Sequence, residues 1–300
     1  MSLSADWIAV DWGTSNMRAW AMRADGTVLA RGESAKGMGQ LTPSQFEPAL
    51  LEAVEQWLNS ERVTPIIACG MVGARQGWIE AEYANTPTPP IAAQATRAPV
   101  ADSRIAVFIL PGVSQMAPPD VMRGEETQIA GYVSAVGPSG TICLPGTHSK
   151  WVEIADGRIT RFRTAMTGEI FSLLAEKSVL RHSVGTNIWS EDGFAAGVRE
   201  ALDDAEIITK LFSIRAGSLL DGVLPQVSRS RLSGLLIGAE LAGAGDYWQG
   251  GDIALIGASR LSALYQTALG LAGVSARVLD AGDMTLAGLC AARAALEETQ

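Results

Sequence analysis

The sequence has few of the residues that build metal centres, disulfide frameworks and membrane spans. It contains two histidines and three cysteines, Cys69, Cys143 and Cys290, in 300 residues. The cysteines lie in apolar runs without the spacing of metal ligands, and their number is odd, which favours buried free thiols in a reducing compartment. No apolar run approaches about 20 residues, and no basic stretch precedes an apolar one near the N-terminus. We therefore expect a soluble cytoplasmic protein.

A surplus of basic residues is also missing. The formal net charge is -9, which argues against binding to nucleic acid or to an anionic membrane. An acidic protein can still bind phosphate locally through backbone amides and a metal ion. The apolar fraction of 47% is enough for a packed core. The length permits one large domain or two of ordinary size, and the sequence has no low-complexity tract or flexible linker.

The stretch most indicative of chemistry begins with the apolar run that ends at Asp11. A tight turn follows it, and residues 17–22 are typical of a returning strand. A second turn at Asp25-Gly26 leads to a further strand over residues 27–32. Small residues in the first turn let backbone N–H groups approach an anion, and a neighbouring acid can hold a hydrated metal ion. The first turn consists of Gly13, Thr14, Ser15 and Asn16.

The same pattern occurs a second time. An apolar run over residues 141–145 is followed by a small-residue turn and by two strands, over residues 151–155 and 158–163, that an Asp156-Gly157 turn joins. Two such halves predict two similar domains that face each other across a cleft and grip phosphates from both sides. Two unrelated hairpins are the alternative, because Asp-Gly turns are common. The second turn consists of Gly146, Thr147, His148, Ser149 and Lys150.

Strands and helices alternate outside the repeats, which predicts an α/β fold with mixed sheets. Residues 42–45 have the spacing of a helix start with a capping box, and the four prolines within residues 83–99 indicate a surface loop. We expect one domain over residues 1–137 and a second over residues 138–300, with the last helix packing back on the first domain. Further helices are expected over residues 46–58, 122–136, 191–202, 229–244, 260–271 and 286–296, and another is expected to begin at residue 170. Further strands are expected over residues 65–69, 104–110, 252–256 and 275–279.

Six motifs follow one another along the chain. They are Asp-Trp-Gly-Thr-Ser-Asn at 11–16, Gly-Met-Val-Gly at 70–73, Met-Arg-Gly-Glu-Glu-Thr-Gln at 122–128, Leu-Pro-Gly-Thr-His-Ser-Lys-Trp at 144–151, Phe-Arg-Thr-Ala-Met-Thr-Gly-Glu at 162–169 and Leu-Ser-Gly-Leu-Leu-Ile-Gly-Ala-Glu at 232–240. In this order and spacing the sequence resembles the 2-dehydro-3-deoxygalactonokinases, from residue 7 to about residue 290.

That resemblance implies membership of the sugar kinase, Hsp70 and actin superfamily. It implies two ribonuclease-H-like (actin-like ATPase) domains with mixed sheets around an ATP cleft between the domains. The implied reaction transfers the γ-phosphoryl group of ATP to the 6-hydroxyl of 2-dehydro-3-deoxy-D-galactonate in galactonate breakdown, with Mg²⁺ as cofactor.

The resemblance also implies roles for residues around the first turn. Asp11 would hold Mg²⁺ through water, and the turn itself would bind the β- and γ-phosphates; a turn-capping aspartate in an ordinary hairpin is the alternative. Arg18, which is polar within an apolar strand, could reach a phosphate or lie on a solvated face. A strand-to-helix junction later in the chain would lie against adenosine. This junction consists of Gly257, Ala258 and Ser259.

The second turn would form the opposing phosphate loop. Lys150 could neutralise charge on the transferring group, and His148 could donate to a phosphate oxygen or simply be satisfied elsewhere. Glu125 and Glu126 are adjacent, so on a helix they point about 100° apart and only one can face the cleft. Exopolyphosphatases of the same superfamily carry a similar Gly-x-Glu-Glu segment whose second glutamate is catalytic. We therefore favour Glu126 as the base or aligner of the acceptor hydroxyl and place Glu125 second, although acids also favour any first helical turn.

The implied substrate is a carboxylate. Arg75, Arg123 and Arg163 are candidates for a bidentate clamp, or could form ordinary ion pairs. Gly70 and Met71 could let the sugar acid approach backbone amides. Three other functions stay open at this point: a phosphohydrolase of the same superfamily, a nucleotide-gated binding protein that needs a protein partner, and a kinase for another 2-keto-3-deoxy sugar acid. The sequence leaves the oligomeric state open.

Overall fold

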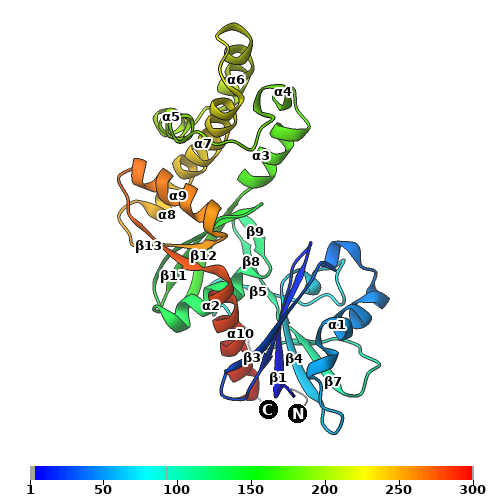
Figure 1. Ribbon diagram of the computed structural model, residues 1–300. Coiled ribbons are helices and arrows are strands. Elements are labelled where there is room, and N and C mark those ends of the chain that lie inside the picture. The colour runs from blue at the N-terminus through cyan, green and yellow to red at the C-terminus, as the bar shows by residue number, and fades with distance from the viewer. Residues whose placement is uncertain (1–3, 92–93, 299–300) are drawn as a thin grey trace. The chain divides into compact units, whose positions relative to one another are not determined.

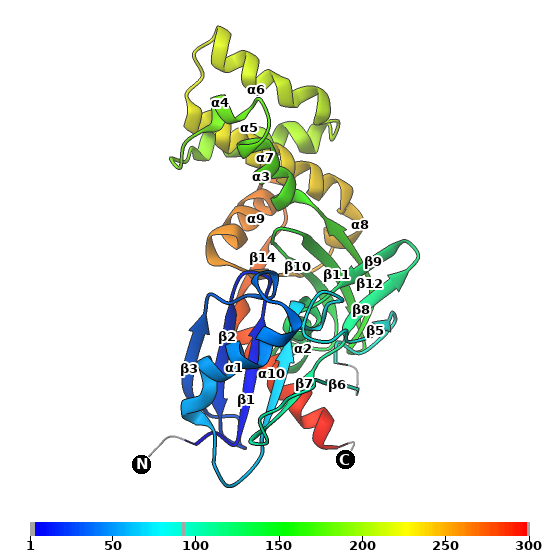
Figure 2. The same cartoon turned by 90° about the vertical axis from the view of Figure 1, so that its right-hand side faces the viewer.

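The computed structural model describes residues 4–91 and 94–298, which form two compact units (Figures 1 and 2). The first unit comprises residues up to Ser139, Ile154–Arg161 and the residues from Ala281 on. The second comprises Gly140–Glu153 and Phe162–Asp280. The domain boundary between residues 137 and 138 stays a prediction. No helix in the described part of the chain combines the length and the apolar character that crossing a bilayer requires.

The first unit is built on a six-stranded mixed sheet in the order β3-β2-β1-β4-β7-β6. In it, β1 pairs antiparallel with β2 and parallel with β4, and β4 pairs parallel with β7. A smaller sheet has the order β5-β8-β9. The strands are β1 (Trp7–Trp12), β2 (Met17–Met22), β3 (Val28–Ser34), β4 (Thr64–Cys69), β5 (Tyr83–Asn85), β6 (Thr96–Arg97), β7 (Ile105–Ile109), β8 (Gly112–Met116) and β9 (Pro119–Met122).

Alternating side chains of β1 fill two separate cores. Ile8 and Val10 pack in a core that includes Leu50 of helix α1 (Phe46–Val54). Trp7 lies on the other face of the strand, in a core that includes Leu289 of helix α10 (Ala281–Glu297). Because successive side chains of a strand point to opposite faces, an unbroken apolar run buries a sheet on both sides. A third helix, α2 (Glu125–Ala135), packs on α10.

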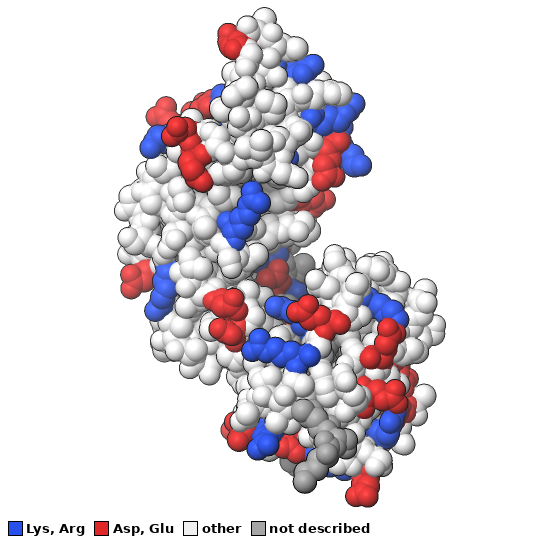
Figure 3. Space-filling model, viewed as in Figure 1, with Lys and Arg blue, Asp and Glu red and all other residues white. Residues whose placement is uncertain are grey.

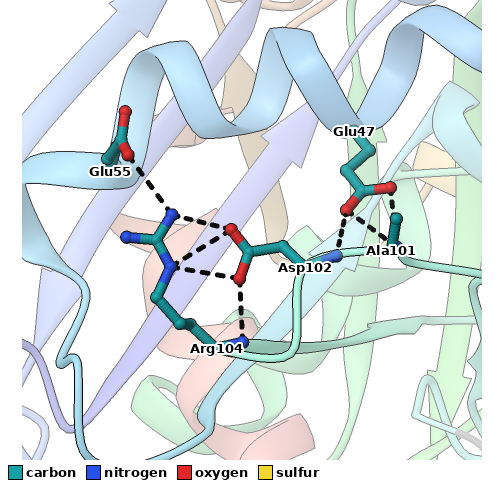
Figure 4. A network of polar contacts seen from close by, with 5 residues as sticks. All are labelled: Glu47, Glu55, Ala101, Asp102 and Arg104. Atoms are coloured by element: carbon teal, nitrogen blue, oxygen red, sulfur yellow. Dashed lines mark hydrogen bonds and ion pairs between the residues drawn. The ribbon is translucent and has the colours of Figure 1, made fainter.

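A polar network fixes α1 to the loop that precedes β7 (Figure 4). The Glu47 carboxylate in the first turn of α1 accepts the N–H groups of Ala101 and Asp102. Arg104 then pairs with Asp102 at 2.7 Å and with Glu55, just beyond the end of α1, at 3.2 Å. Hydrogen bonds from Arg104 lower the pKa of Asp102. The helix is thereby held over the sheet at both of its ends.

The second unit contains most of a five-stranded sheet in the order β12-β11-β10-β13-β14, of which Ile154–Arg161 is counted with the first unit. In it, β13 pairs parallel with both β10 and β14. The strands are β10 (Gly140–Leu144), β11 (Ser149–Ala155), β12 (Arg158–Ala165), β13 (Ile253–Gly257) and β14 (Ala276–Asp280). The helices are α3 (Thr167–Glu176), α4 (Arg181–Val184), α5 (Glu191–Asp203), α6 (Ile208–Leu220), α7 (Pro225–Gly243), α8 (Gly245–Trp248) and α9 (Ser259–Leu271).

The two larger sheets share one strand order. The order β3-β2-β1-β4-β7 in the first sheet corresponds to β12-β11-β10-β13-β14 in the second, and the last two strands of each series pair in parallel. The first sheet has β6 in addition, antiparallel to β7. The α/β class with mixed sheets is confirmed. Each hairpin ends in the predicted small-residue turn, between β1 and β2 and between β10 and β11. A phosphate-binding cleft shared by the two turns stays a prediction.

Charged side chains of both signs are mixed on the surface. On the face drawn in Figure 3, basic and acidic side chains alternate over both units, and neither sign gathers into one patch. Interspersed charge keeps a protein soluble without creating a strong local field.

Two helix pairs pack so closely that only glycine fits at the contact. A Cβ on Gly288 of α10 would lie 1.8 Å from the carbonyl oxygen of Thr127, and a Cβ on Gly131 of α2 would lie 2.0 Å from that of Met284. In the second unit, a Cβ on Gly234 of α7 would lie 2.2 Å from a backbone oxygen of α5. A backbone oxygen cannot give way unless the whole helix moves. Each pair is therefore held at a fixed distance.

We expect Gly288→Ala to destabilise the protein by about 1–3 kcal/mol, because overpacking outweighs the gain of about 1 kcal/mol in helix propensity. Urea unfolding followed by circular dichroism measures the change. The matched control is Gly270→Ala in α9, where no atom lies within 4 Å of an added Cβ. The control should be neutral or more stable than wild type. Equal stability of the two variants would contradict the close contact between α2 and α10.

Candidate active site

The first turn is held in place by the loop that follows β3. Within the turn, the Gly13 N–H donates to the Asn16 carbonyl at 2.9 Å, and the Gly39 N–H donates to the Thr14 carbonyl at 2.9 Å. A Cβ on Gly37 would lie 2.2 Å from the carbonyl carbon of Ser15, so the two segments touch backbone to backbone. The side chains of Thr14, Ser15 and Asn16 are exposed. A rigid backbone with accessible small polar residues suits anion binding.

Asp11 and Arg18 lie opposite each other across the β1–β2 register. The Arg18 guanidinium donates to Asp11 Oδ2 from both Nε, at 3.2 Å, and Nη2, at 2.5 Å. The Asp11 side chain is 21% exposed, so the pair lies at the edge of the protein beside the turn. The predicted roles of Asp11 in metal binding and of Arg18 in phosphate binding stay predictions. Arg18 in this structure neutralises the acid.

Gly70 and Gly124 allow the start of α2, which carries Glu126, to approach the end of β1. Gly70 follows β4 with φ of 94°, and a Cβ there would lie 2.7 Å from the Trp12 carbonyl oxygen. Gly124 precedes α2 with φ of 110°, and a Cβ there would lie 3.3 Å from the Gly70 Cα. Both conformations are open to glycine and strained for other residues. The start of α2, with Glu126, therefore lies near the end of β1.

Cys69 lies beside Asp11 and within electrostatic reach of Glu126. Its Sγ is 3.9 Å from Asp11 Oδ1. Burial raises the pKa of the Cys69 thiol well above its usual value, and the Asp11 and Glu126 carboxylates raise it further. A thiol with so high a pKa remains neutral, so Cys69 adds no charge beside Asp11. Asp11 and Glu126, predicted separately from the sequence, thus both influence Cys69 in the first unit, and a shared active site stays a prediction.

Glu126 is almost fully buried, with 1% of its surface exposed. Its carboxylate accepts the Gly124 N–H at 2.8 and 2.7 Å and the Thr127 hydroxyl at 3.3 Å. Burial raises the pKa of Glu126 to about 7, and the charge of Glu125 adds to the rise, while backbone N–H groups oppose it. Glu125 is only partly buried and accepts the Arg123 N–H at 3.0 Å. The two neighbours therefore occupy different environments.

The three candidate arginines differ in their surroundings. Arg123 is 8% exposed, stacks over the Tyr83 ring at 4.2 Å and donates from Nη2 to the Ala81 carbonyl at 2.7 Å. Its Nε and Nη1 have no hydrogen-bond partner among the described residues. Arg75 is exposed on the loop that starts at Gly70 and Met71, and Arg163 pairs with Asp246 at 3.1 Å in the second unit. A substrate contact of any of these arginines stays a prediction.

In the second unit, the Gly146–Thr147 turn packs against the start of α3. A Cβ on Gly168 would lie 2.4 Å from the Gly146 carbonyl oxygen, and the Glu169 N–H donates to the Thr147 carbonyl at 3.0 Å. His148 Nε2 lies 2.6 Å from Glu169 Oε2. Thr147 and His148 are exposed, as the side chains of a phosphate loop must be.

The last two residues of the predicted loop point into the protein. Ser149 is fully buried and its hydroxyl lies 2.8 Å from the Tyr265 hydroxyl. Lys150 is 5% exposed and, as its neighbour in β11, lies on the opposite face of the strand. Direct contact of either side chain with a phosphate stays a prediction.

A cavity of about 310 Å³ opens beside this turn, within the second unit. Gly146 and Ala258 border the cavity. Gly257 adjoins the Gly146–Thr147 turn, since a Cβ on Gly257 would lie 3.1 Å from the Pro145 carbonyl oxygen. Sequence reasoning missed the apolar and aromatic lining because its helical spacing is equally typical of core packing. The lining includes Phe171, Trp189, Leu236, Ile237, Leu261 and Leu264.

Comparison with known proteins bears on the candidate residues of each unit. A family model described as 2-keto-3-deoxy-galactonokinase matches residues 11–292. The chain belongs to this family. It is 43% identical over 311 residues to "Probable 2-dehydro-3-deoxygalactonokinase DgoK1" of Rhizobium meliloti (strain 1021), with 99% of each chain covered. It is also 38% identical to 2-dehydro-3-deoxygalactonokinase of Escherichia coli (strain K12), with 94% of each chain covered.

Solved structures agree with this membership. A crystal structure from Sinorhizobium meliloti, provisionally named a 2-dehydro-3-deoxygalactonokinase, is 42% identical and has a TM-score of 0.90, with 97% of this chain and 99% of that chain covered. A ligand-bound xylulose kinase from Lactobacillus acidophilus is 10% identical with a TM-score of 0.52, covers 98% and 90% of the two chains, and shares the fold alone. The predicted family, fold class and enzyme, a 2-dehydro-3-deoxygalactonokinase, are confirmed. Membership implies the use of ATP and a sugar acid.

We expect Glu126→Gln to gain stability relative to wild type as the pH rises. The pKa of Glu126 is about 7 in the folded protein and has its usual value of 4.5 in the unfolded chain. As the pH rises from 4.5 to 7, the unfolded chain therefore releases the Glu126 proton before the folded protein does, and the free energy of unfolding of wild type falls. At about 1.4 kcal/mol per pH unit, the variant should gain up to about 3 kcal/mol on wild type between pH 4.5 and pH 8. Urea unfolding of both proteins across this range measures it. A constant difference would mean that Glu126 ionises normally.

Proposed function

We propose that this kinase phosphorylates the 6-hydroxyl of 2-dehydro-3-deoxy-D-galactonate, with Mg²⁺ bound near Asp11 and with Glu126 as the acceptor's base. The supporting observation is that the end of β1, with Asp11, and the start of α2, with Glu126, both approach the Cys69–Gly70 segment, in a chain of this family. The 6-hydroxyl oxygen forms a bond to the γ-phosphorus, the bond to the β-phosphate oxygen breaks, and ADP leaves. The reaction belongs to galactonate catabolism and would take place in the cytoplasm.

Glu126 has the protonation behaviour that this role needs. A general base works best with a pKa near the operating pH, and burial raises the pKa of Glu126 to about 7. In our proposal it accepts the proton of the 6-hydroxyl, or aligns that hydroxyl, while the Gly124 N–H holds the carboxylate in place. Phosphoryl transfer depends more on positioning and charge neutralisation than on covalent help from the protein.

Asp11 fits a magnesium site of the kind that kinases use. Mg²⁺ is usually held by one or two carboxylates together with waters and substrate phosphates. Among the described residues, no group of three or more His, Cys, Asp and Glu side chains is placed to hold a metal ion by itself. A single partly exposed carboxylate beside a phosphate-binding turn is consistent with that arrangement. When bound, Mg²⁺ would neutralise charge on the phosphate oxygens.

Within each unit the turn would bind phosphate oxygens. Thr14, Ser15 and Asn16 would offer amides and side chains in the first unit, with Arg18 beside them. Thr147 and His148 would do so in the second. The cavity beside Gly146 and Ala258 suits adenosine, because ligand pockets of about 300–1,000 Å³ with aromatic walls and few polar groups are typical of small-molecule sites.

The sugar acid would be received by the Gly70–Gly73 loop. Arg123 borders this loop, since a Cβ on Gly73 would lie 3.0 Å from its Nη1, and Arg75 follows two residues later. A carboxylate favours guanidinium donors that other groups leave unpaired. Arg123 Nε and Nη1 meet that condition among the described residues, whereas Asp246 engages Arg163.

An ADP-release assay over a panel of sugar acids, with and without Mg²⁺, tests the function. We expect turnover with 2-dehydro-3-deoxy-D-galactonate and Mg²⁺ and formation of the 6-phosphate. Asp11→Asn should reduce turnover at least about 100-fold and leave the protein folded, because the metal's protein ligand is lost. Phosphate release without a sugar acid would indicate a phosphohydrolase, and preference for another acid would change the substrate. Normal turnover in Asp11→Asn would remove Asp11 from the metal site.

We expect Glu126→Gln to lower kcat by about 100-fold or more, the scale of losing a general base. Glu125→Gln is the matched control, since it removes a neighbouring carboxylate in a different environment and should lower kcat by less than about 10-fold. Rates at saturating substrates, measured with wild type alongside, give the comparison. The opposite ranking of the two variants would assign the base to Glu125.

A further inference from the structure

A second buried carboxylate lies outside the residues assigned so far. Glu240 on α7 is 8% exposed. Its Oε1 accepts the Trp151 indole N–H at 2.8 Å, and its Oε2 accepts the Tyr265 hydroxyl at 2.6 Å and the Thr167 hydroxyl. None of the ion pairs found among the described residues involves Glu240. Three neutral donors therefore hold this carboxylate.

Such a carboxylate is expensive to keep in a core. Removing it from water costs several kcal/mol unless hydrogen bonds compensate, and an apolar side chain of similar size is often as stable. Burial raises the pKa of Glu240, and the hydrogen bonds from Thr167, Tyr265 and Trp151 oppose the rise. The position of Glu240 in the fold indicates a role beyond packing.

The three donors to Glu240 come from three different elements, and two of them line the cavity. Thr167 is the first residue of α3 and Tyr265 belongs to α9, and both line the cavity. Ser233 and Ile237, which lie on the same face of α7 as Glu240 by their spacing, line it as well. The carboxylate thus joins the three helices that form the walls.

The hydrogen bonds also reach the phosphate turn. A tyrosine hydroxyl has one proton, and that of Tyr265 is donated to the Glu240 carboxylate. The Ser149 hydroxyl, 2.8 Å away, must then donate to the Tyr265 oxygen. Ser149 directly follows the exposed residues of the Gly146–His148 turn. A directed chain therefore runs from the turn, through Tyr265, to the acid on α7.

We propose that Glu240 is a positioning residue for the nucleotide, which fixes the walls of the cavity and the Gly146–Ser149 turn relative to one another. The proposal rests on the proposed function of this cavity as the adenosine site. Glu240 itself touches neither nucleotide nor sugar acid. It acts by keeping Tyr265, Thr167 and Ser149 in one arrangement, so that ATP binds to a site that is already formed.

Glu240→Gln is the sharpest test, because it keeps the volume and replaces one acceptor oxygen by an N–H donor. That donor meets the hydroxyls of Tyr265 and Thr167, so the chain to Ser149 must reverse or break. We expect the KM for ATP to rise about 10-fold or more, as for the loss of a hydrogen bond to a charged group. The KM for the sugar acid should stay within about two-fold and kcat within about three-fold of wild type, because binding energy is lost equally before and during reaction.

Glu200→Gln is the matched control. It removes a carboxylate of α5 that pairs with Arg231 of α7 at 2.8 Å, in the same unit but outside the cavity lining. The control should leave the KM for ATP within about two-fold of wild type. A role of Glu240 in folding alone would lower kcat through loss of active protein, with both KM values unchanged. That result, or an equal rise in both KM values, would overturn the proposal.

Direct binding of ADP, measured by calorimetry on wild type and Glu240→Gln, separates this inference from the proposed function. ADP binding that weakens about 10-fold in the variant supports the positioning role even if the sugar acid proves to be a different one. A wild-type protein that does not bind ADP overturns both. Should Glu240→Gln fail to fold, Tyr265→Phe and Thr167→Val each remove one donor. An unchanged affinity for ADP in both of these would overturn the positioning role.

Discussion

The site in the first unit depends on a backbone contact at Gly70. Because a Cβ there would lie 2.7 Å from the Trp12 carbonyl oxygen, the chain leaves β4 directly against the end of β1. The parallel pairing of β1 with β4 sets Cys69 beside Asp11, and the approach of Gly124 to Gly70 adds the start of α2 and with it Glu126. Two acids from distant parts of the sequence meet because three short backbone segments have no side chains between them.

The three carboxylates of interest are stabilised in different ways, and the difference matches their exposure. Asp11, at the surface, pairs with a cation. Glu126 and Glu240, in the interior, are held by backbone N–H groups and by neutral side-chain donors, and the pKa of each is raised by burial. An ion pair at the edge can exchange partners with little cost, whereas a buried acid bound by fixed dipoles keeps its position. The surroundings therefore leave Asp11 free to change partners and hold Glu126 and Glu240 in fixed positions.

Local patterns predicted the parts of the fold that local chemistry decides. The capping box of Thr42 and Gln45, the two small-residue turns and the strands around them are as expected, because each is specified by residues a few positions apart. Residues 83–99, expected to be a loop, contain β5 and β6, which exist only through pairing with β8 and β7. Helix α6 was not predicted, although Ile207, Leu211 and Ile214 have helical spacing and pack in one core, because exposed apolar residues such as Phe212, Leu219 and Leu220 obscure that stripe.

In the candidate site, too, local contacts could be predicted from the sequence and long-range contacts could not. Asp11 and Arg18 flank a four-residue turn, so their pairing follows from the hairpin register and could have been predicted. The proximity of Asp11 to Glu126 could not, because it depends on how close two loops approach. The role of Glu240 was equally hidden, since a single acid in an apolar helix is as typical of a solvated edge.

The repeated hairpin has been adapted to different chemistry in its two copies. Counted from the turn glycine, the positions of Asp11 and Arg18 in the first copy correspond to Leu144 and Trp151 in the second. The first copy therefore has an ion pair beside its turn. The second has an apolar residue and an indole whose N–H is donated to Glu240. The buried carboxylate beside the second hairpin thus comes from α7 and is shielded from water, which suits it to hold a cavity in shape rather than to bind a metal ion.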